Sequence, residues 1–555
     1  MIMQIEKKQE LLTGLLVAAI AFLVYANSLG NGFALDDTSV ILNNPALRGR
    51  PSALFSSIDT TSDKQLLPFY RPLTYLTFYA EGRLHGFNPF LVRFFNVLLH
   101  SVNAFLVYRL ARTLINDKFA ALLVGLLFAV HPLHTEGVDF NAGGRNTMLA
   151  CFFVLMAYLL HRRSIIRKNI SAALAGAAFF LAGLFSKESA FAILPLIMAQ
   201  EIIPVREKAS GSRSRTAIRL LPYIAASTGY LVMRWMTLSS FGIQTSILPG
   251  ISSPLLQSLY IIPGLTERLL NNLYILPRYL LTIIWPTALS SRYVVPDDLN
   301  LFALPLVSAW LCIIGILGWL FTRGRSMVSL FGLSWFALFW LPVSGIVYVP
   351  GAPLADRFLY IPAIGLWLAA ADQISRLVPS GNAARKYTVV AATLVLIMLA
   401  ILTVRRNLDW KNDITLYARF VDQYPDNAYG HVGLGTAYYS ERRSNNSYLD
   451  LAERELEKAL AFSQTTEYFP AAHNQLGHIK QNRGDYRGAL YHYNEALAIF
   501  PYDKEARINR GMIYEKLGRY QEAVAEYQFY LSIPGENDIP GAQAYAEERV
   551  RELTR

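Results

Sequence analysis

The sequence predicts an all-helical protein in which a membrane domain with many spans precedes a helical solenoid. Hydrophobic residues make up 53% of the 555 residues and charged residues only 16%, whereas soluble domains average about 45–50% and about 25%. Apolar segments recur up to residue 404, and a repeat of 34 residues follows them. These observations exclude a single soluble enzyme, a disordered chain and a small disulfide-rich scaffold.

The first 404 residues are predicted to form the membrane domain. Residues 11–29 are almost uninterrupted apolar sequence, long enough at about 1.5 Å per residue to cross a bilayer core of about 30 Å. Further apolar segments follow near residues 91–114, 119–133, 147–161, 170–185, 189–204, 218–237, 270–286, 302–321, 328–347, 357–371 and 387–404. We expect about 11 to 13 spans, with a re-entrant or interfacial helix or one more crossing between residues 237 and 300.

Basic residues assign the two sides of the membrane, because Lys and Arg are retained in cytoplasmic loops. Residues 1–404 carry 32 Lys or Arg and 18 Asp or Glu, whereas residues 405–555 carry 19 and 22. The basic excess lies in loops between apolar segments, at residues 162–168, 206–219, 323–325 and 376–386. With these basic loops inside, the C-terminal part and four loops lie outside. The four loops are residues 31–90, 134–146 and 186–188 and the one with Asp356–Arg357. The distribution indicates membrane topology and gives no support to nucleic-acid binding.

The repeat occupies residues 405–555. Small and aromatic residues recur at its spacing, namely Gly477 and Gly511, Gly484 and Gly518, Tyr486 and Tyr520, Ala489 and Ala523, and Tyr493 and Tyr527. Small residues fit where two helices approach closely and aromatic residues fill the groove between them, as in tetratricopeptide repeats. We predict about three copies, the first of them imperfect, after a leading half-repeat at residues 409–425.

Charged residues at the outer ends of apolar segments are the candidate functional residues, because charge near a membrane is costly. Asp36 and Asp37 come first, and adjacent carboxylates suit a general base or a metal ligand, or equally a solvated loop or a helix cap. His131, His134 and Glu136 could bind a metal, although Pro132 favours a helix end. An acidic pair and two histidines permit a divalent cation without requiring one.

Three further candidates carry positive charge. Arg145 has a guanidinium group, which forks onto phosphate oxygens. Two acid–base neighbours follow other apolar segments, Lys187–Glu188 and Asp356–Arg357. Either could be an internal ion pair. We favour an anionic lipid headgroup, because several external loops deliver charge to one face of the membrane.

Other site classes find no support. Cys151 and Cys312 lie within apolar runs, which is typical of buried thiols rather than of redox or metal sites. The sequence contains no P-loop, no Rossmann glycine fingerprint after a strand, no zincin motif and no paired Cys-x-x-Cys motifs.

Several motifs in a fixed order resemble one family, the transmembrane and tetratricopeptide repeat glycosyltransferases. They are residues 33–37 (FALDD), 70–74 (YRPLT), the run 94–103 with Asn96, His100 and Asn103, residues 131–136 (HPLHTE), 186–188 (SKE) and 355–360 (ADRFLY). The resemblance spans nearly the whole chain. It implies a GT-C membrane domain over residues 1–404, followed by the repeats.

The resemblance also implies a reaction. A sugar would pass with inversion from a polyprenyl-phosphate carrier to a protein hydroxyl, as in mannosyl transfer, on the outer face of a membrane. Asp36 or Asp37 would be the base, and the lipid phosphate would be held by Arg145, Lys187 and Arg357. Substrate would be positioned by the remaining residues, namely His131, His134, Glu136, Glu188 and Asp356, and Glu188 would do so by orienting Lys187. After Gly144-Arg145 many relatives carry an acidic residue, whereas Asn146 and Thr147 follow here.

The short repeat array and the compact inner loops favour a bacterial inner membrane, with the repeats extracytoplasmic and recruiting the acceptor protein. Two alternatives stay open. A non-catalytic scaffold of the cell envelope would use the membrane domain only as an anchor. A flippase of lipid-linked sugars would carry its charged residues midway through its spans.

Overall fold

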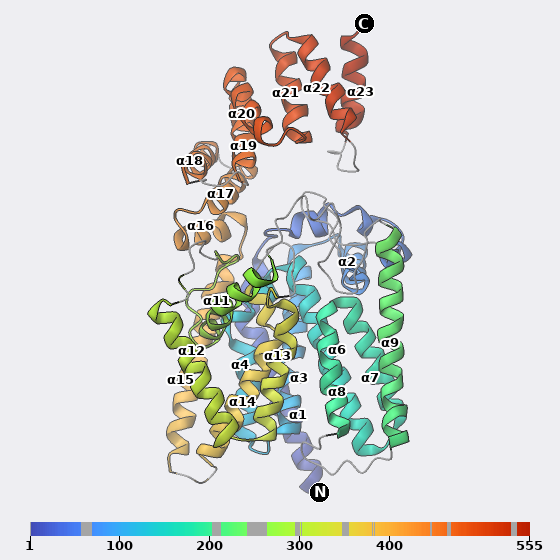
Figure 1. Ribbon diagram of the computed structural model, residues 1–555, viewed down its shortest axis with the longest axis vertical. Coiled ribbons are helices and arrows are strands. Elements are labelled where there is room, and N and C mark those ends of the chain that lie inside the picture. The colour runs from blue at the N-terminus through green and yellow to red at the C-terminus, as the bar shows by residue number, and fades with distance from the viewer. Residues whose placement is uncertain are drawn as a thin grey trace. The chain divides into compact units, whose positions relative to one another are not determined.

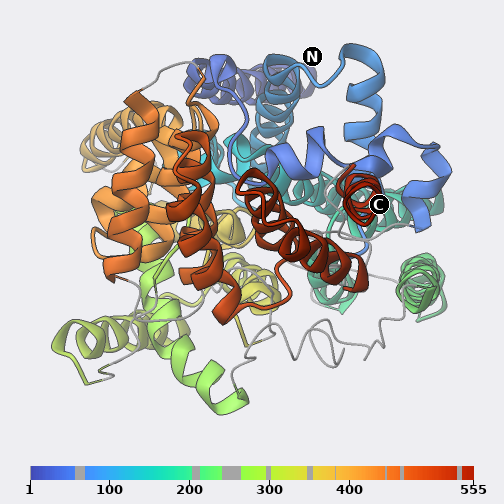
Figure 2. The ribbon, with the colours of Figure 1, turned by 90° about the horizontal axis from the view of Figure 1, so that it is seen from above.

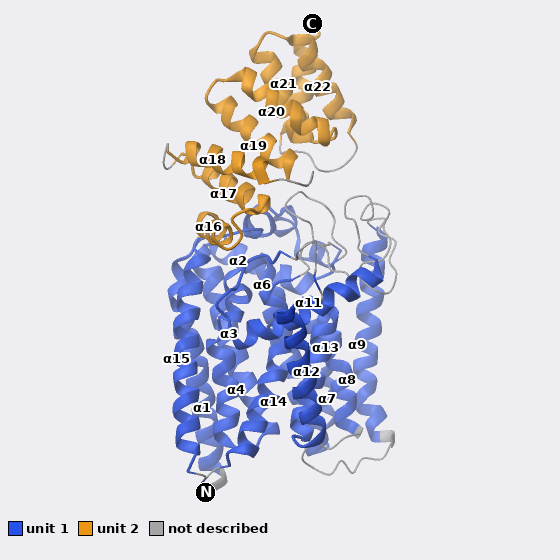
Figure 3. Ribbon diagram, turned by 60° about the vertical axis from the view of Figure 1, so that its left-hand side comes forward, with its two compact units in different colours: residues 1–62, 66–411 blue, residues 63–65, 412–555 orange. Residues whose placement is uncertain are grey.

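All regular secondary structure in the described residues is helical (Figure 1). The computed structural model describes residues 2–56, 69–202, 213–240, 264–294, 300, 302–346, 354–379, 381, 383–443, 447–462, 468–533 and 541–555. Contacts divide the chain into two compact units, with Lys411 the last residue of the first and Asn412 the start of the long segment of the second (Figure 3). We predicted the boundary after residue 404, and the last helix of the first unit continues through it to Asp409.

The first unit is a bundle of long helices. They are α1 (Ile2–Tyr25), α2 (Pro72–His85), α3 (Pro89–Leu114), α4 (Lys118–Val130), α5 (Thr135–Asp139), α6 (Asn141–Arg167), α7 (Ile170–Ser186), α8 (Ile193–Ile202), α9 (Arg213–Ser240), α11 (Leu265–Ile284), α12 (Leu304–Thr322), α13 (Met327–Trp340), α14 (Pro362–Leu377) and α15 (Arg385–Asp409). Short helical turns join them, among them η1 (Ala26–Gly30), η5 (Pro132–His134), η6 (Glu188–Ala192) and η8 (Asp356–Leu359).

Local sequence explains several helix ends. Asn88 and Asp117 cap α3 and α4 by accepting from the N–H groups of Leu91 and Ala120. Pro89 follows its cap directly, where a missing N–H costs nothing. Pro132 lies just after α4, so that α4 and the following helical turns meet at a bend of 46°.

Within the described residues, five helices are long and apolar enough to cross a membrane, or up to six if the bent pair at Pro132 is one span. The five lie at Gln4–Gly30, Pro89–Leu114, Asn141–Arg167, Leu304–Thr322 and Arg385–Asp409. Shorter apolar helices, Ile170–Ser186 and Met327–Val343, belong to the same unit. The chain is therefore a multi-pass membrane protein, and the number of 11 to 13 spans stays a prediction. In the segment 237–300, α11 is present, while residues 241–263 and 295–299 lie outside the described residues.

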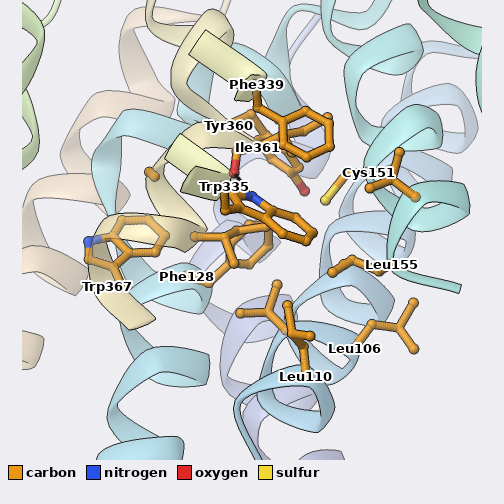
Figure 4. Packing of buried hydrophobic residues seen from close by; sticks show 14 of the residues in the cluster. Leu106, Leu110, Phe128, Cys151, Leu155, Trp335, Phe339, Tyr360, Ile361 and Trp367 are labelled. Atoms are coloured by element: carbon orange, nitrogen blue, oxygen red, sulfur yellow. Dashed lines mark hydrogen bonds between the residues drawn. The ribbon is translucent and has the colours of Figure 1, made fainter. Parts of the chain in front are cut away.

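The core of the first unit is aromatic at its centre (Figure 4). Trp335 is completely buried, with its indole N–H donating to the carbonyl of Ile361 at 2.9 Å. Phe128 and Tyr360 pack edge to face with ring centroids 5.1 Å apart. Cys151 is buried beside them, as predicted, whereas Cys312 is exposed. The prediction for Cys312 was wrong because α12 turns most of its surface away from the bundle.

The second unit contains the paired helices of the repeat, seen from above in Figure 2. They are α16 (Asp413–Gln423), α17 (Ala428–Ser440), α18 (Ser447–Phe462), α19 (Phe469–Asn482), α20 (Tyr486–Ile499), α21 (Lys504–Lys516), α22 (Tyr520–Ser532) and α23 (Ala542–Leu553). A Cβ on Gly477 would lie 2.5 Å from the ring of Tyr493, and one on Gly511 would lie 2.6 Å from the ring of Tyr527. The small and aromatic positions thus meet twice in the same way, which confirms the predicted helical repeat.

Candidate functional site

The segment between α1 and α2 carries the Asp36–Asp37 pair. Leu35, directly before it, has a φ of 53°, a left-handed conformation that is strained for a branched residue. Asp37 is completely buried, and its carboxylate accepts from the N–H of Ala142 at 2.7 Å, from the Asn141 amide at 2.8 Å and from the N–H of Ala34 at 3.3 Å. Asp36 is exposed. The structure thereby separates two adjacent carboxylates into a buried anchor and an accessible group.

Burial raises the pKa of Asp37 to about 6, and the bonds from Ala142 and Asn141 oppose that rise. Close by, Arg93 donates to the carbonyls of Gly32 and Asp139 at 2.6 and 2.7 Å and pairs with the Asp139 carboxylate. Arg93 is itself completely buried. The loop is therefore held from two sides, by the start of α6 and by α3.

Arg145 lies on α6, one turn after Asn141, and is completely buried. Its guanidinium pairs with Glu81 of α2 at 2.9 Å, and it also donates to Asn96, to the Thr77 hydroxyl and to the carbonyl of Val92. All three guanidinium nitrogens are thus engaged within the chain. Burial raises the pKa of Glu81, and its partner Arg145 opposes that rise.

Arg357 and Glu136 form a second pair, between η8 and α5. The Glu136 carboxylate accepts from the backbone N–H of Arg357 at 2.9 Å and from its guanidinium. The neighbouring Asp356 is buried and accepts from the hydroxyl of Tyr293. Burial, and then the negative charge of Glu136, raise the pKa of Asp356. Of the two acid groups, Glu136 therefore holds Arg357 while Asp356 is held by Tyr293.

Lys187 follows α7 and is buried, with its ammonium donating to the Thr147 hydroxyl at 2.7 Å. Burial lowers the pKa of Lys187 well below its usual value, and the positive charges of Arg71 and Arg357 lower it further. Lys187 and Arg357 both lie over the ring of Phe358, at 5.5 and 5.0 Å from its centroid. Three cations, Lys187, Arg71 and Arg357, therefore interact electrostatically with two carboxylates, Glu136 and Glu188. The excess of positive charge favours an anion in this region.

Glu188 holds the third of these cations. Its carboxylate accepts from Arg71 at 3.1 and 3.2 Å and from the backbone N–H of Tyr70 at 3.3 Å. The exposed fractions of the Arg71 and Glu188 side chains are 12% and 17%, so both reach the surface of the unit. Glu188 thus orients Arg71, whereas we expected it to orient Lys187.

The two predicted histidines, His131 and His134, are buried. His131 contacts the carbonyl of Ile283 at 2.9 Å through Nε2 and accepts from the N–H of Leu133 at 3.2 Å. Neither ring nitrogen of His134 has a hydrogen-bond partner. Its ring packs on Phe128 and Tyr360, with centroids 4.5 and 4.6 Å away. Within the described chain, no group of three or more His, Cys, Asp and Glu side chains could hold a metal ion.

Residues 136–147 are the common support of the predicted site. Arg357 is bonded to Glu136, Asp37 to Ala142 and Lys187 to Thr147. Reasoning from sequence missed the partners of these groups, which are Arg71, Glu81, Arg93, Asn141 and Tyr293. Arg71 and Glu81 are ionisable residues close to an apolar helix, which is the one signal that could have singled them out.

Comparison with known proteins gives two family matches. Residues 72–234 match the family described as dolichyl-phosphate-mannose-protein mannosyltransferase, and residues 474–538 match a tetratricopeptide repeat family. Protein O-mannosyl-transferase TMTC3 of Mus musculus is 24% identical over 93% of this chain and 54% of its own length. The predicted resemblance is therefore confirmed.

Two other relatives of the transmembrane and tetratricopeptide repeat type agree. Protein O-mannosyl-transferase F38B6.6 of Caenorhabditis elegans is 27% identical over 76% of this chain and 59% of its own length. Protein O-mannosyl-transferase Tmtc1 of Drosophila melanogaster is 36% identical over 32% of this chain and 21% of its own length. The chain spans about half the length of the TMTC3 relatives it matches.

The mannosyltransferase match begins at α2 and ends within α9. It therefore contains the support at residues 136–147, together with Glu81, Asn96 and Lys187. The Asp36–Asp37 pair and Arg357 lie outside it. The roles assigned to the ten predicted site residues accordingly stay predictions.

Proposed function

We propose that the chain is a membrane glycosyltransferase that moves a sugar, in keeping with its relatives a mannose, from a polyprenyl-phosphate donor to a hydroxyl of an acceptor protein. The observation that carries the proposal is the shared support of Asp37, Lys187 and Arg357 on residues 136–147. It ties the loop that carries the accessible carboxylate of Asp36 to the same short segment that holds Lys187 and Arg357. An inverting transfer needs those two features, a base for the acceptor and positive charge for the leaving phosphate.

Asp36 is the proposed base. As the acceptor oxygen attacks the anomeric carbon, Asp36 takes the proton of the hydroxyl. The bond between the anomeric carbon and the phosphate oxygen breaks, and its electron pair leaves with the polyprenyl phosphate. Asp37 is completely buried and bonded to three donors, so it holds the loop and does not reach an acceptor. Leu35, with its positive φ, is the point at which the backbone turns to present Asp36.

Lys187, Arg357 and Arg71 form the proposed phosphate site. The buried ammonium of Lys187 donates to a neutral hydroxyl, so its charge is poorly compensated, and a phosphate would supply the missing negative charge. Arg71 and Arg357 are each held by one carboxylate and keep 12% and 18% of their side chains exposed. Their guanidinium groups can therefore turn toward a ligand without losing their anchors.

We place the reaction on the extracytoplasmic face of a bacterial inner membrane, with the repeats recruiting the acceptor. The basic loops lie at the opposite ends of the same helices, and this supports the extracytoplasmic side for the reaction. Support for the repeats as the docking part comes from stacked helix pairs, which present a continuous surface to a partner. His131, His134 and Asp356 would line or support the substrate region.

The test uses the purified full chain in nanodiscs with a panel of polyprenyl-phosphate sugars, following donor consumption. Wild type is expected to consume one donor, and Asp36→Asn and Lys187→Met are expected to lose at least about a hundredfold in rate. Glu6→Gln, an exposed position near the start of α1, is the matched control and should keep full activity. Absence of both turnover and donor binding with every sugar of the panel would favour the scaffold instead.

A further inference from the structure

A continuous chain of hydrogen bonds joins the buried pair of Arg145 and Glu81 to Asp37. Arg145 Nε donates to Oδ1 of Asn96, and Nδ2 of Asn96 donates to Oδ1 of Asn141 at 3.0 Å. Nδ2 of Asn141 then donates to Oδ2 of Asp37 at 2.8 Å. Four separate elements supply these side chains: α2, α3, α6 and the segment before α2.

Water does not replace any link of this chain. Arg145, Asn96, Asn141 and Asp37 all have an exposed fraction of 0%. Each hydrogen bond lies in surroundings of low polarity. A buried polar group that lacks its hydrogen bond costs free energy there, so each donor stays aligned with its acceptor. The geometry at one end therefore depends on the geometry at the other.

The polarity of the chain follows from Arg145. A guanidinium group can only donate, so the Asn96 atom that faces it has to be the oxygen. The Asn96 nitrogen then faces the oxygens of Val138 and Asn141. That in turn leaves the Asn141 nitrogen facing Asp37, which has to accept. The backbone N–H groups of Ala142 and Ala34 point at the same carboxylate.

We propose that Asn96 and Asn141 are positioning residues that transmit the fixed polarity of Arg145 to Asp37 and thereby hold the loop that presents Asp36. The inference rests on the proposed function, because it takes Asp36 as the base. It also gives Arg145 a role inside the protein in place of a contact with the donor phosphate. Arg145 suits this role because every guanidinium nitrogen is already bonded and its plane lies between Phe78 and Phe95, at 4.6 and 4.5 Å from their centroids.

The decisive variant is Asn141→Asp, which keeps the shape of the side chain and removes the donor. Above neutral pH two carboxylates then face each other, and the loop is pushed away. As the pH falls, the pair takes up one proton, and that proton restores a donor between the two side chains. We expect the transfer rate to drop at least about tenfold at pH 8 and to recover as the pH is lowered, so that the optimum lies below that of wild type.

A second readout does not need activity. Because the shared proton binds more tightly in the folded protein than in the unfolded chain, the unfolding temperature of Asn141→Asp should rise as the pH falls from about 8 to about 5. Asn103→Asp is the matched control. It makes the same change in α3, two turns after Asn96. There Asn103 donates to the carbonyl of Met148 and to Tyr360, and it makes no hydrogen bond to Arg145, Asn96, Asn141 or Asp37. Its rate profile with pH should keep the wild-type shape.

If Asn141→Asp does not fold, Asn141→Ser and Asn141→Ala replace it. The hydroxyl of Ser retains a donor, so Ser should keep a higher kcat than Ala, with the KM for donor equal in both. Equal kcat in Ser and Ala, or rate and stability profiles of Asn141→Asp that run parallel to wild type, would overturn the inference. If wild type is active, Asp36→Asn is inactive and the profiles of Asn141→Asp are still parallel to wild type, this inference alone is overturned and the proposed function stands. Absence of transfer in wild type with every donor would overturn the proposed function instead, and the unfolding profile would still decide the hydrogen-bond chain.

Discussion

The backbone N–H of Ala142 donates a 2.7 Å hydrogen bond to Oδ1 of Asp37 and so ties the first turn of α6 to the loop after α1. The bond joins residues 105 positions apart in the sequence. Its geometry gives the two adjacent carboxylates different tasks, because the side chain that accepts it is buried and its neighbour Asp36 is not.

Asp36→Asn and Asp37→Asn should differ in stability although both lose activity. An Asn at position 37 would turn one amide nitrogen toward a donor, since Oδ1 and Oδ2 both accept in the wild type. We expect Asp37→Asn to lower the free energy of unfolding by about 1–3 kcal/mol. Asp36→Asn, at an exposed position, should leave it unchanged. Thermal unfolding in nanodiscs measures the difference, and equal unfolding temperatures for the two variants would refute it.

The transfer rate should fall as the pH drops through about 6. Burial raises the pKa of Asp37 to about 6, and the protonated carboxyl can no longer accept at both oxygens. Ionised Asp37 is therefore the form that holds the loop, and activity is expected above this pKa and lost below it. Measurement of kcat/KM between pH 5 and pH 8 checks the prediction. A profile that is flat through pH 6 would speak against a role for Asp37 in the loop.

Much of the fold could be predicted because it depends on patterns among residues that are close in the sequence. The repeat was visible because Gly477 and Tyr493 touch within one helix pair, so that their spacing recurs 34 residues later in Gly511 and Tyr527. The end of α4 was visible because Pro132 lacks an N–H group. The number of spans was harder to predict, since α7 and α13 are short for a bilayer and part of the segment 237–300 lies outside the described residues.

The partners within the candidate site could not be predicted. Arg145 and Glu81 are 64 positions apart, and Arg357 and Glu136 are 221 positions apart. Hydrophobic periodicity indicates which face of a helix is apolar. It does not indicate which residue, distant in the sequence, contacts that face. A charged residue near a membrane therefore indicated a site without showing whether its charge was already paired. Arg145 is paired with Glu81, whereas Lys187 donates to a neutral hydroxyl.

Arg71 should contribute to donor binding as strongly as the residues singled out from sequence. Arg71→Met removes one of the three cations of the proposed phosphate site, and we expect the KM for donor to rise about tenfold, the size of one charge-assisted hydrogen bond. Arg71→Lys keeps the charge, so its KM for donor should lie between those of wild type and Arg71→Met. Arg109→Met is a matched control, because its partner Glu10 lies on α1 and neither residue contacts the site. An unchanged KM in Arg71→Met would remove Arg71 from the phosphate site.

Close packing of α13 on α14 should make Gly332 intolerant of any side chain. A Cβ at Gly332 would lie 2.3 Å from the carbonyl oxygen of Gly365, and one at Gly365 would lie 2.2 Å from that of Gly332. Backbone cannot yield as a flexible side chain does, so Gly332→Ala should cost about 1–3 kcal/mol of stability. Gly315→Ala, on the apolar helix α12 with nothing within 4 Å of its Cβ, is the control and should be neutral or slightly stabilising. Unfolding temperatures that fall equally in both variants would trace the loss to the alanine itself, and a loss confined to Gly332→Ala would trace it to the contact between the two helices.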